Sequence, residues 1–170
     1  MQLGAKARYA VMAMTDLARA LRDGRGDGAA VGRGVSLAEI AARQELSLPY
    51  LEQLFARLRR AGLVVSARGP GGGYRLAHAA ADTPIAAIVE AVDEPIHAVR
   101  CGGPEKAGGC MSTGARCLTH DLWDGLGFEI DRYLKSVSLE DVIERRVKRR
   151  SSDPAQPQPA LSQPAQWEPA

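Results

Sequence analysis

The sequence has no hydrophobic run long enough to cross a bilayer. A membrane-spanning helix needs about 18 consecutive apolar residues, and no stretch of the 170 residues approaches that length. The beginning, Met-Gln-Leu-Gly-Ala-Lys-Ala-Arg, also lacks the apolar segment and cleavage site of a secretory signal. We therefore expect a cytoplasmic protein that has no membrane partner.

Cysteine is scarce, and the motifs of catalysis are missing. The three cysteines are an odd number and cannot all form internal disulfide bonds. In a reducing compartment such thiols are more often free, catalytic or metal-bound than structural bridges. The sequence contains neither a Gly-x-Ser-x-Gly turn nor a local pair of nucleophile and base. We therefore do not expect an enzyme.

The charges are unevenly distributed along a chain of ordinary globular composition, with 45% hydrophobic and 25% charged residues. Residues 1–75 carry 12 Lys and Arg against 6 Asp and Glu, whereas the remaining 95 residues carry 10 against 14. A basic first half favours contact with a polyanion. An unevenly charged but merely solvated surface is the alternative.

The first 62 residues predict three helices. Apolar residues at steps of three and four indicate a helix over 6–21, and a Gly-rich loop follows at 23–34. Ser36 and Glu39 form the pattern of a capping box at the start of a short second helix. Ser47 is placed to cap the third helix, and Gly62 to end it. The buried stripe of the third helix is expected to consist of Leu51, Leu54, Phe55 and Leu58. The residues off this stripe are expected to face outward: Tyr50, Glu52, Gln53, Arg57 and Arg60.

Two β-prone runs follow the third helix. They lie at 63–65 and 74–76, and a Gly- and Pro-rich segment connects them, as in a hairpin. Three helices with a tight connection between the second and third, followed by a hairpin, are the order of a winged helix-turn-helix. The predicted fold is mainly α with a small β-hairpin wing, and the DNA-binding domain spans 1–80.

Residues 81–150 are predicted to form a second region. One helix begins at Thr83-Pro84, and a long helix spans about 118–137. The long helix carries an apolar stripe of about five turns, which favours pairing with a second subunit; packing on the first helix of the same chain is the alternative. The stripe consists of Leu118, Leu122, Leu126, Ile130, Tyr133, Leu134 and Val137. Residues 151–170 are rich in Pro, Gln, Ala and Ser, which predicts a disordered tail.

The third helix and the wing carry the side chains expected to contact DNA. Gln53 can form paired hydrogen bonds with adenine, and Glu52 can accept a hydrogen bond from the cytosine amino group. Tyr50 is suited to a phosphate or a base methyl, and Arg68 to the adjacent minor groove. The residues suited to phosphate contacts or to positioning are Arg57, Arg59 and Arg60.

A metal centre is predicted from the cysteines. Cys101, Cys110 and Cys117 lie within 17 residues of one another in a Gly-rich segment, and His120 follows three residues later. Three thiolates and one imidazole suit either a tetrahedral zinc ion or an iron–sulfur cluster. The spacing lacks the short paired intervals of zinc fingers. Three unrelated thiols are the other interpretation.

Five segments resemble IscR-type regulators, a winged-helix family of bacterial iron–sulfur cluster-responsive transcription factors. The resemblance covers about residues 1–145 and rests on Lys6-Ala-Arg-Tyr-Ala-Val-Met-Ala-Met14, Ser47-Leu-Pro-Tyr-Leu-Glu-Gln-Leu-Phe55, Arg68-Gly-Pro-Gly-Gly-Gly-Tyr74, Ala91-Val-Asp-Glu94 and Cys117-Leu-Thr-His120-Asp-Leu-Trp123.

The resemblance implies a homodimeric regulator that binds double-stranded DNA operators and carries one 2Fe–2S cluster per subunit. Such a regulator controls cluster-assembly genes as a repressor or activator, and the assembly machinery supplies its cluster. The implied ligands are Cys101, Cys110, Cys117 and His120, and the implied DNA-contacting positions are Ser47, Tyr50, Glu52, Gln53 and Arg68. Two alternatives stay open: a nitric-oxide-responsive relative with a 4Fe–4S cluster, and a zinc-stapled interaction protein that does not bind DNA.

Overall fold

The structure, a computed structural model, describes residues 4–24, 34–67, 72–92 and 117–147. Outside this part of the chain lie Arg68, Cys101 and Cys110, most of the expected loop at 23–34, and the expected tail at 151–170. In chain order the elements are α1 (Ala5–Arg22), α2 (Leu37–Gln44), α3 (Leu48–Arg60), β1 (Val64–Ala67), β2 (Gly73–Leu76), a 3-10 turn (Ala80–Asp82), α4 (Ile85–Ala91), α5 (His120–Lys135) and α6 (Leu139–Ile143). The described residues are mainly helical and form one β-hairpin, which is the predicted fold class.

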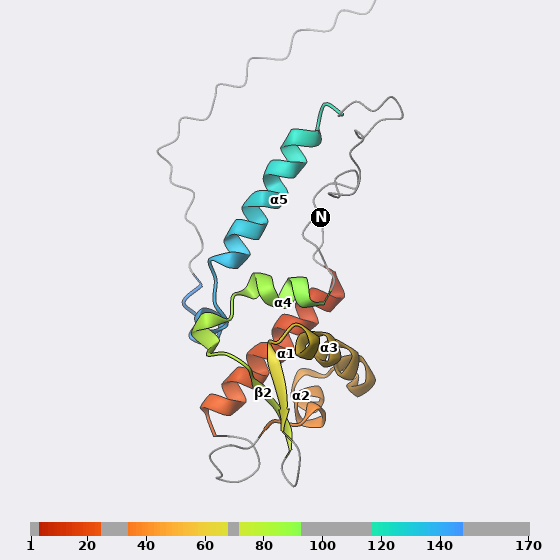
Figure 1. Ribbon diagram of the computed structural model, residues 1–170, viewed down its shortest axis with the longest axis vertical. Helices are drawn as coiled ribbons and strands as arrows, with labels where there is room; N and C mark the ends of the chain where they lie inside the picture. The colour runs from red at the N-terminus through yellow and green to blue at the C-terminus, as the bar shows by residue number, and fades with distance from the viewer. Residues whose placement is uncertain (1–3, 25–33, 68–71, 93–116, 148–170) are drawn as a thin grey trace, which may run out of the picture.

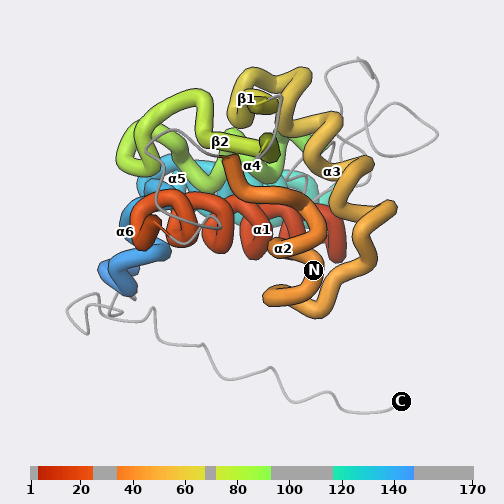
Figure 2. Tube along the Cα trace, turned by 90° about the horizontal axis from the view of Figure 1, so that it is seen from below, coloured from red at the N-terminus to blue at the C-terminus, as the bar shows by residue number. Residues whose placement is uncertain are grey.

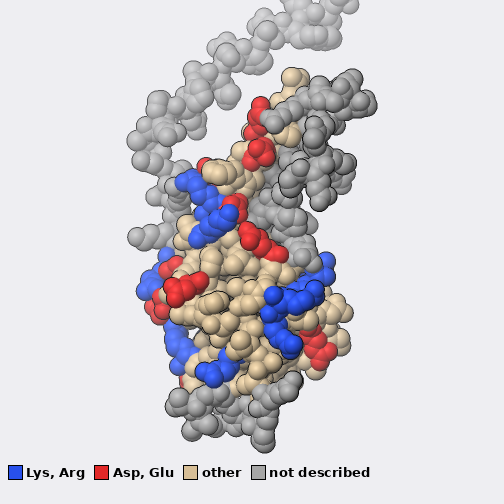
Figure 3. Space-filling view, in the orientation of Figure 1, with Lys and Arg blue, Asp and Glu red and all other residues tan. Residues whose placement is uncertain are grey.

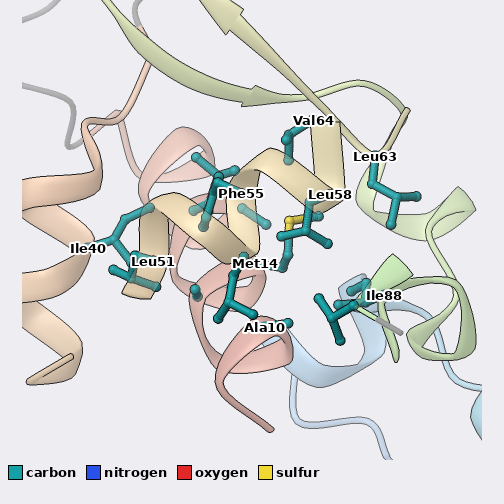
Figure 4. Packing of buried hydrophobic residues seen from close by; sticks show 14 of the residues in the cluster. Ala10, Met14, Ile40, Leu51, Phe55, Leu58, Leu63, Val64 and Ile88 are labelled. Carbon is teal, nitrogen blue, oxygen red and sulfur yellow. The ribbon is translucent and has the colours of Figure 1, made fainter. Parts of the chain in front are cut away.

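Helix α1 lies at the centre of the arrangement. It crosses the middle of the molecule and packs against α2, α3, α4 and α6, whereas α5 projects away from the body (Figure 1, Figure 2). Met14 and Leu17 of α1 are fully buried. Figure 4 shows Ala10 and Met14 facing the buried side chains of α3. All four residues of the predicted α3 stripe are buried: Leu51, Leu54, Phe55 and Leu58.

The ends of the helices follow the predicted signals, with one exception. Ser36 caps α2 through a complete capping box with Glu39. At the end of α3, Gly62 adopts a positive φ of 73°, and its amide donates to the Arg59 carbonyl, a glycine-terminated helix end. Ser47 occupies the N-cap position of α3, but its side chain makes no capping hydrogen bond. Its exposed hydroxyl therefore takes no part in capping the start of α3.

The hairpin is antiparallel and is joined to the segment before α2. Val64 pairs with Leu76, and Ala67 pairs with Gly73. An isolated bridge connects Val35 with Tyr74, so the wing is tied to the chain that enters the helix-turn-helix. Each strand includes residues beyond the predicted runs, because the backbone pairing continues where the β-prone sequence stops.

The C-terminal elements return to the body of the molecule. Pro84 and Ser138 form an isolated bridge, and the amide of Leu139, which is fully buried, donates to the Thr83 carbonyl at 2.8 Å. Helix α5 begins two residues later and ends two residues earlier than the predicted span of 118–137. Within the described part of the chain, no helix combines the length and the hydropathy that a membrane span requires.

Candidate nucleic-acid interface and metal-ligand pair

The solvent side of α3 carries polar and basic residues. Glu52 and Gln53 are exposed, and they lie opposite the buried stripe, as the sequence predicted. Ser47, at the start of the helix, and Arg59, near its end, are also exposed. Figure 3 shows Lys and Arg side chains gathered on the right of this face, where Figure 1 places α3. One helix therefore presents hydrogen-bonding groups beside positive charge.

The start of α3 is held against α1 by two aromatic rings. The rings of Tyr50 and Tyr9 lie edge to face, with centroids 5.9 Å apart. Tyr50 is half-buried rather than fully outward as predicted, because its ring covers part of α1. Its place on α3 still adjoins that of Glu52 and Gln53.

Arg57 differs from the predicted outward position. It is half-buried, and its Nη1 donates to the Val92 carbonyl at 3.3 Å. Carbonyls at the end of a helix lack intrahelical donors and attract cations, and Val92 is the residue that ends α4. Arg57 therefore joins α3 to α4, whereas Arg59 remains exposed and Arg60 donates to the carbonyl of Ala56.

The wing carries one further basic residue that was not predicted from the sequence. Arg75 is exposed in the middle of β2 and pairs with Val65 of β1. The alternation of side chains along a strand could have indicated this position, since Tyr74 and Leu76 on either side are half-buried. Arg68, the wing residue that was predicted, lies outside the described residues.

Two of the four predicted metal ligands are described, and they lie together. Cys117 and His120 are both half-buried, and the His120 amide donates to the Cys117 carbonyl at 3.0 Å. This turn leads directly into α5. Among the described residues no group of three or more His, Cys, Asp or Glu is arranged to hold a metal. The thiol and the imidazole are suitable donors for zinc or iron, and the other two predicted ligands belong to 93–116, outside the described residues.

The apolar stripe of α5 divides into two parts. Leu134 and Val137 pack against the core of the same chain. Toward the N-terminal end of the helix, Leu118, Leu122 and Leu126 are exposed, and Leu122 has 64% of its surface accessible. The part of α5 that projects from the body in Figure 1 therefore presents uncovered hydrophobic side chains.

Helix α2, a short turn and helix α3, followed by an antiparallel hairpin on the same core, define a winged helix-turn-helix protein of the class of DNA-binding transcriptional regulators. A family model described as Rrf2, iron-dependent transcriptional regulator, matches residues 3–145. The chain belongs to this family.

Relatives and solved structures agree with this assignment. The transcriptional regulator IscR of Cereibacter sphaeroides is 43% identical over 155 residues, which cover 91% of this chain and 95% of the relative. IscR of Photorhabdus laumondii is 48% identical over 143 residues, covering 84% and 79%. The structure of T. potens IscR superposes with a TM-score of 0.64 at 32% identity, covering 86% of this chain and 88% of that one.

A further solved relative carries a different functional name. CymR, the global cysteine regulator of B. subtilis, has a TM-score of 0.64 at 29% identity, with coverage of 85% and 98%. The relatives are named as transcriptional regulators, so the chain is a regulator of this family and not an enzyme. The predicted resemblance to IscR-type regulators is confirmed.

Proposed function

We propose that this protein is a cytoplasmic homodimer that binds double-stranded DNA operators and responds to iron–sulfur cluster status through a 2Fe–2S cluster. It would control cluster-assembly genes as a repressor or activator, and the assembly machinery would donate its cluster. The single observation that carries the sensing proposal is the Cys117–His120 turn at the start of α5. The fold alone does not support the sensing proposal, because one fold can serve regulators with different functions.

Operator binding is supported by the exposed side of α3. Glu52 and Gln53 offer acceptors and donors for base edges, Ser47 offers a hydroxyl, and Arg59 offers a cation for phosphate. Tyr50 and Arg57 combine proposed DNA contacts with packing against α1 and α4. Arg68 is proposed as the wing residue that contacts the minor groove.

The cluster proposal rests on the donor set. Cys101, Cys110, Cys117 and His120 would hold the cluster, and the two described members fit because they lie on one turn and are half-buried. When bound, a cluster held by three thiolates and one imidazole supplies a redox-active centre that is less negative than one held by four thiolates. Gain and loss of this group would then report cluster supply.

The homodimer proposal rests on α5. Leu118, Leu122 and Leu126 extend the apolar stripe beyond the part that the chain's own core covers. A second copy of the same helix would cover this surface, as in symmetric dimers built on long helices. Two recognition helices held in one dimer would bind two halves of an operator.

The first test is composition and colour. Protein purified without oxygen should be red-brown and contain about two irons and two sulfides per chain, the content of a 2Fe–2S cluster. About four of each would favour the nitric-oxide-responsive relative. A colourless protein with zinc and no sulfide, even after reconstitution, would refute the cluster proposal.

Substitution of the proposed ligands tests which residues bind the cluster. We expect Cys117→Ser and His120→Ala to lower the iron content and the visible absorption of the purified protein, because each removes one donor. His78→Ala is the matched control, since His78 is an exposed histidine after β2 that belongs to no proposed site. Equal iron content in His120→Ala and His78→Ala would exclude His120 as a ligand.

Salt dependence separates operator binding from the zinc-stapled alternative. Affinity for a duplex that the wild-type protein selects from a randomised library should fall steeply and log-linearly with salt, because phosphate contacts release counterions. A protein that selects no duplex at low salt would refute the DNA-binding proposal.

A further inference from the structure

Two glycines cross where β2 leaves the turn of the hairpin, with no room for a side chain on either. Gly34 precedes Val35, and Gly73 is the first residue of β2. A Cβ built on Gly34 would lie 2.8 Å from the carbonyl carbon of Gly73. A Cβ built on Gly73 would lie 2.5 Å from the carbonyl carbon and oxygen of Val35. All these neighbours are backbone atoms, so no side-chain rotation can relieve the contact.

The crossing joins the wing to both helices of the helix-turn-helix. The Val35 amide donates to the Tyr74 carbonyl at 2.9 Å, and the Tyr74 amide donates to the Val35 carbonyl at 2.8 Å. Ser36, the next residue, caps α2. The ring of Tyr74 packs edge to face on Phe55 of α3, with centroids 4.9 Å apart. The first residues of β2, next to the hairpin turn, are therefore held between the start of α2 and the buried side of α3.

The close approach decides where β2 lies relative to α3. Carbon atoms in ordinary contact are about 3.5 Å apart, so a methyl group at Gly73 requires a backbone shift of roughly 1 Å. The shift must separate β2 from Val35 or move both strands of the hairpin together, since β1 and β2 are paired along their length. Either movement changes the position of the wing relative to the solvent side of α3.

We propose that Gly34 and Gly73 are positioning residues for DNA binding, which set the wing at the angle where it and α3 contact one duplex. Neither residue touches DNA in this proposal, which rests on the proposed operator binding. Neither glycine has a positive φ, so close packing, and not backbone conformation, requires glycine at both positions.

The test compares Gly34→Ala and Gly73→Ala with wild type on a duplex that the wild-type protein selects from a randomised library. We expect affinity to fall about tenfold or more in Gly73→Ala, and less in Gly34→Ala, whose clash is milder. Hydroxyl-radical protection of the minor groove beside the recognition bases should weaken, while the preferred recognition bases stay unchanged. His78→Ala is the control, because His78 is exposed just after β2 and belongs to no proposed site.

Thermal unfolding of the same variants distinguishes positioning from folding. Both alanine variants should unfold cooperatively. If both variants lose cooperative unfolding, the glycines are needed for folding and the proposal is overturned. The proposal is also overturned if Gly73→Ala keeps wild-type affinity and wild-type minor-groove protection. If wild-type protein selects no duplex, operator binding itself fails; equal binding by wild type and Gly73→Ala refutes only the role of the glycines.

Discussion

Glu52 and Gln53 are neighbours on the exposed side of α3, and they differ in what they can accept or donate. A carboxylate only accepts hydrogen bonds, whereas an amide side chain both donates and accepts. In a DNA groove a carboxylate is unfavourable next to phosphates unless a donor such as the cytosine amino group meets it. We therefore propose that Glu52 is a residue through which this helix rejects operators as well as selects them.

We predict that Glu52→Ala relaxes the ranking of operator sequences. Discrimination at the contacted base pair should fall by about 1–3 kcal/mol, because the penalty for sites without a cytosine donor disappears. The measurement is competitive binding to a set of duplexes that differ at single positions, with and without the cluster. Glu90→Ala, at an exposed carboxylate on α4, is the control. An unchanged ranking in Glu52→Ala would contradict this role.

At the scale of elements, α3 is fixed at both ends by contacts with other helices. Tyr50 packs on Tyr9 of α1 near its start, and Arg57 bonds the carbonyl that ends α4. Helix α4 in turn packs against α1 and α5. The orientation of the recognition helix is therefore decided by elements far from it in sequence.

Arg57 and Arg59, on the same helix, should behave differently when replaced. Arg57→Ala should lower the free energy of unfolding by about 1 kcal/mol, since the Val92 carbonyl loses its donor. Arg59→Ala should change stability by less than about 0.5 kcal/mol but reduce the salt slope of DNA binding by about one. Denaturant unfolding and salt titrations measure the two effects. Equal stability of the two variants would show that the Val92 contact does not hold α4.

At the scale of the whole molecule, α5 projects from a body in which α2, α3, α4 and α6 pack around α1. The exposed leucines near its N-terminal end and the Cys117–His120 turn lie in the same part of the helix. A dimer formed through α5 would therefore place the proposed ligands close to the subunit interface. In such a dimer, a change at the proposed cluster ligands would alter the distance between the two copies of α3.

If the protein is the proposed α5 dimer, the double variant Leu122→Glu/Leu126→Glu should convert it to a monomer. Two buried carboxylates at the interface would be desolvated without partners. In the single chain both side chains are exposed, so the variant should still fold cooperatively. Analytical ultracentrifugation measures the change, and Asp124→Asn, an exposed position between the two leucines, is the control. A dimer that persists in the double variant would place the interface elsewhere.

Local patterns determined most of the elements and the division of α3 into two faces. The capping box of Ser36 and Glu39, the glycine end at Gly62 and the buried stripe from Leu51 to Leu58 depend on residues within a few positions of one another. The turn from Cys117 to His120 at the start of α5 likewise depends on residues three positions apart. These features follow from helical periodicity and capping, which the sequence carries directly.

The contacts that orient these elements were decided only by the tertiary structure. Arg57 meets Val92 across 35 positions, and Gly34 meets Gly73 where two distant backbones cross. Neither contact has a local pattern, because each depends on how the helices and the wing pack around α1. The sequence by itself determined that Glu52 and Gln53 of α3 face solvent. The packing decided that Arg57 turns to α4, that Tyr50 is half-covered by α1, and where the wing lies beside α3.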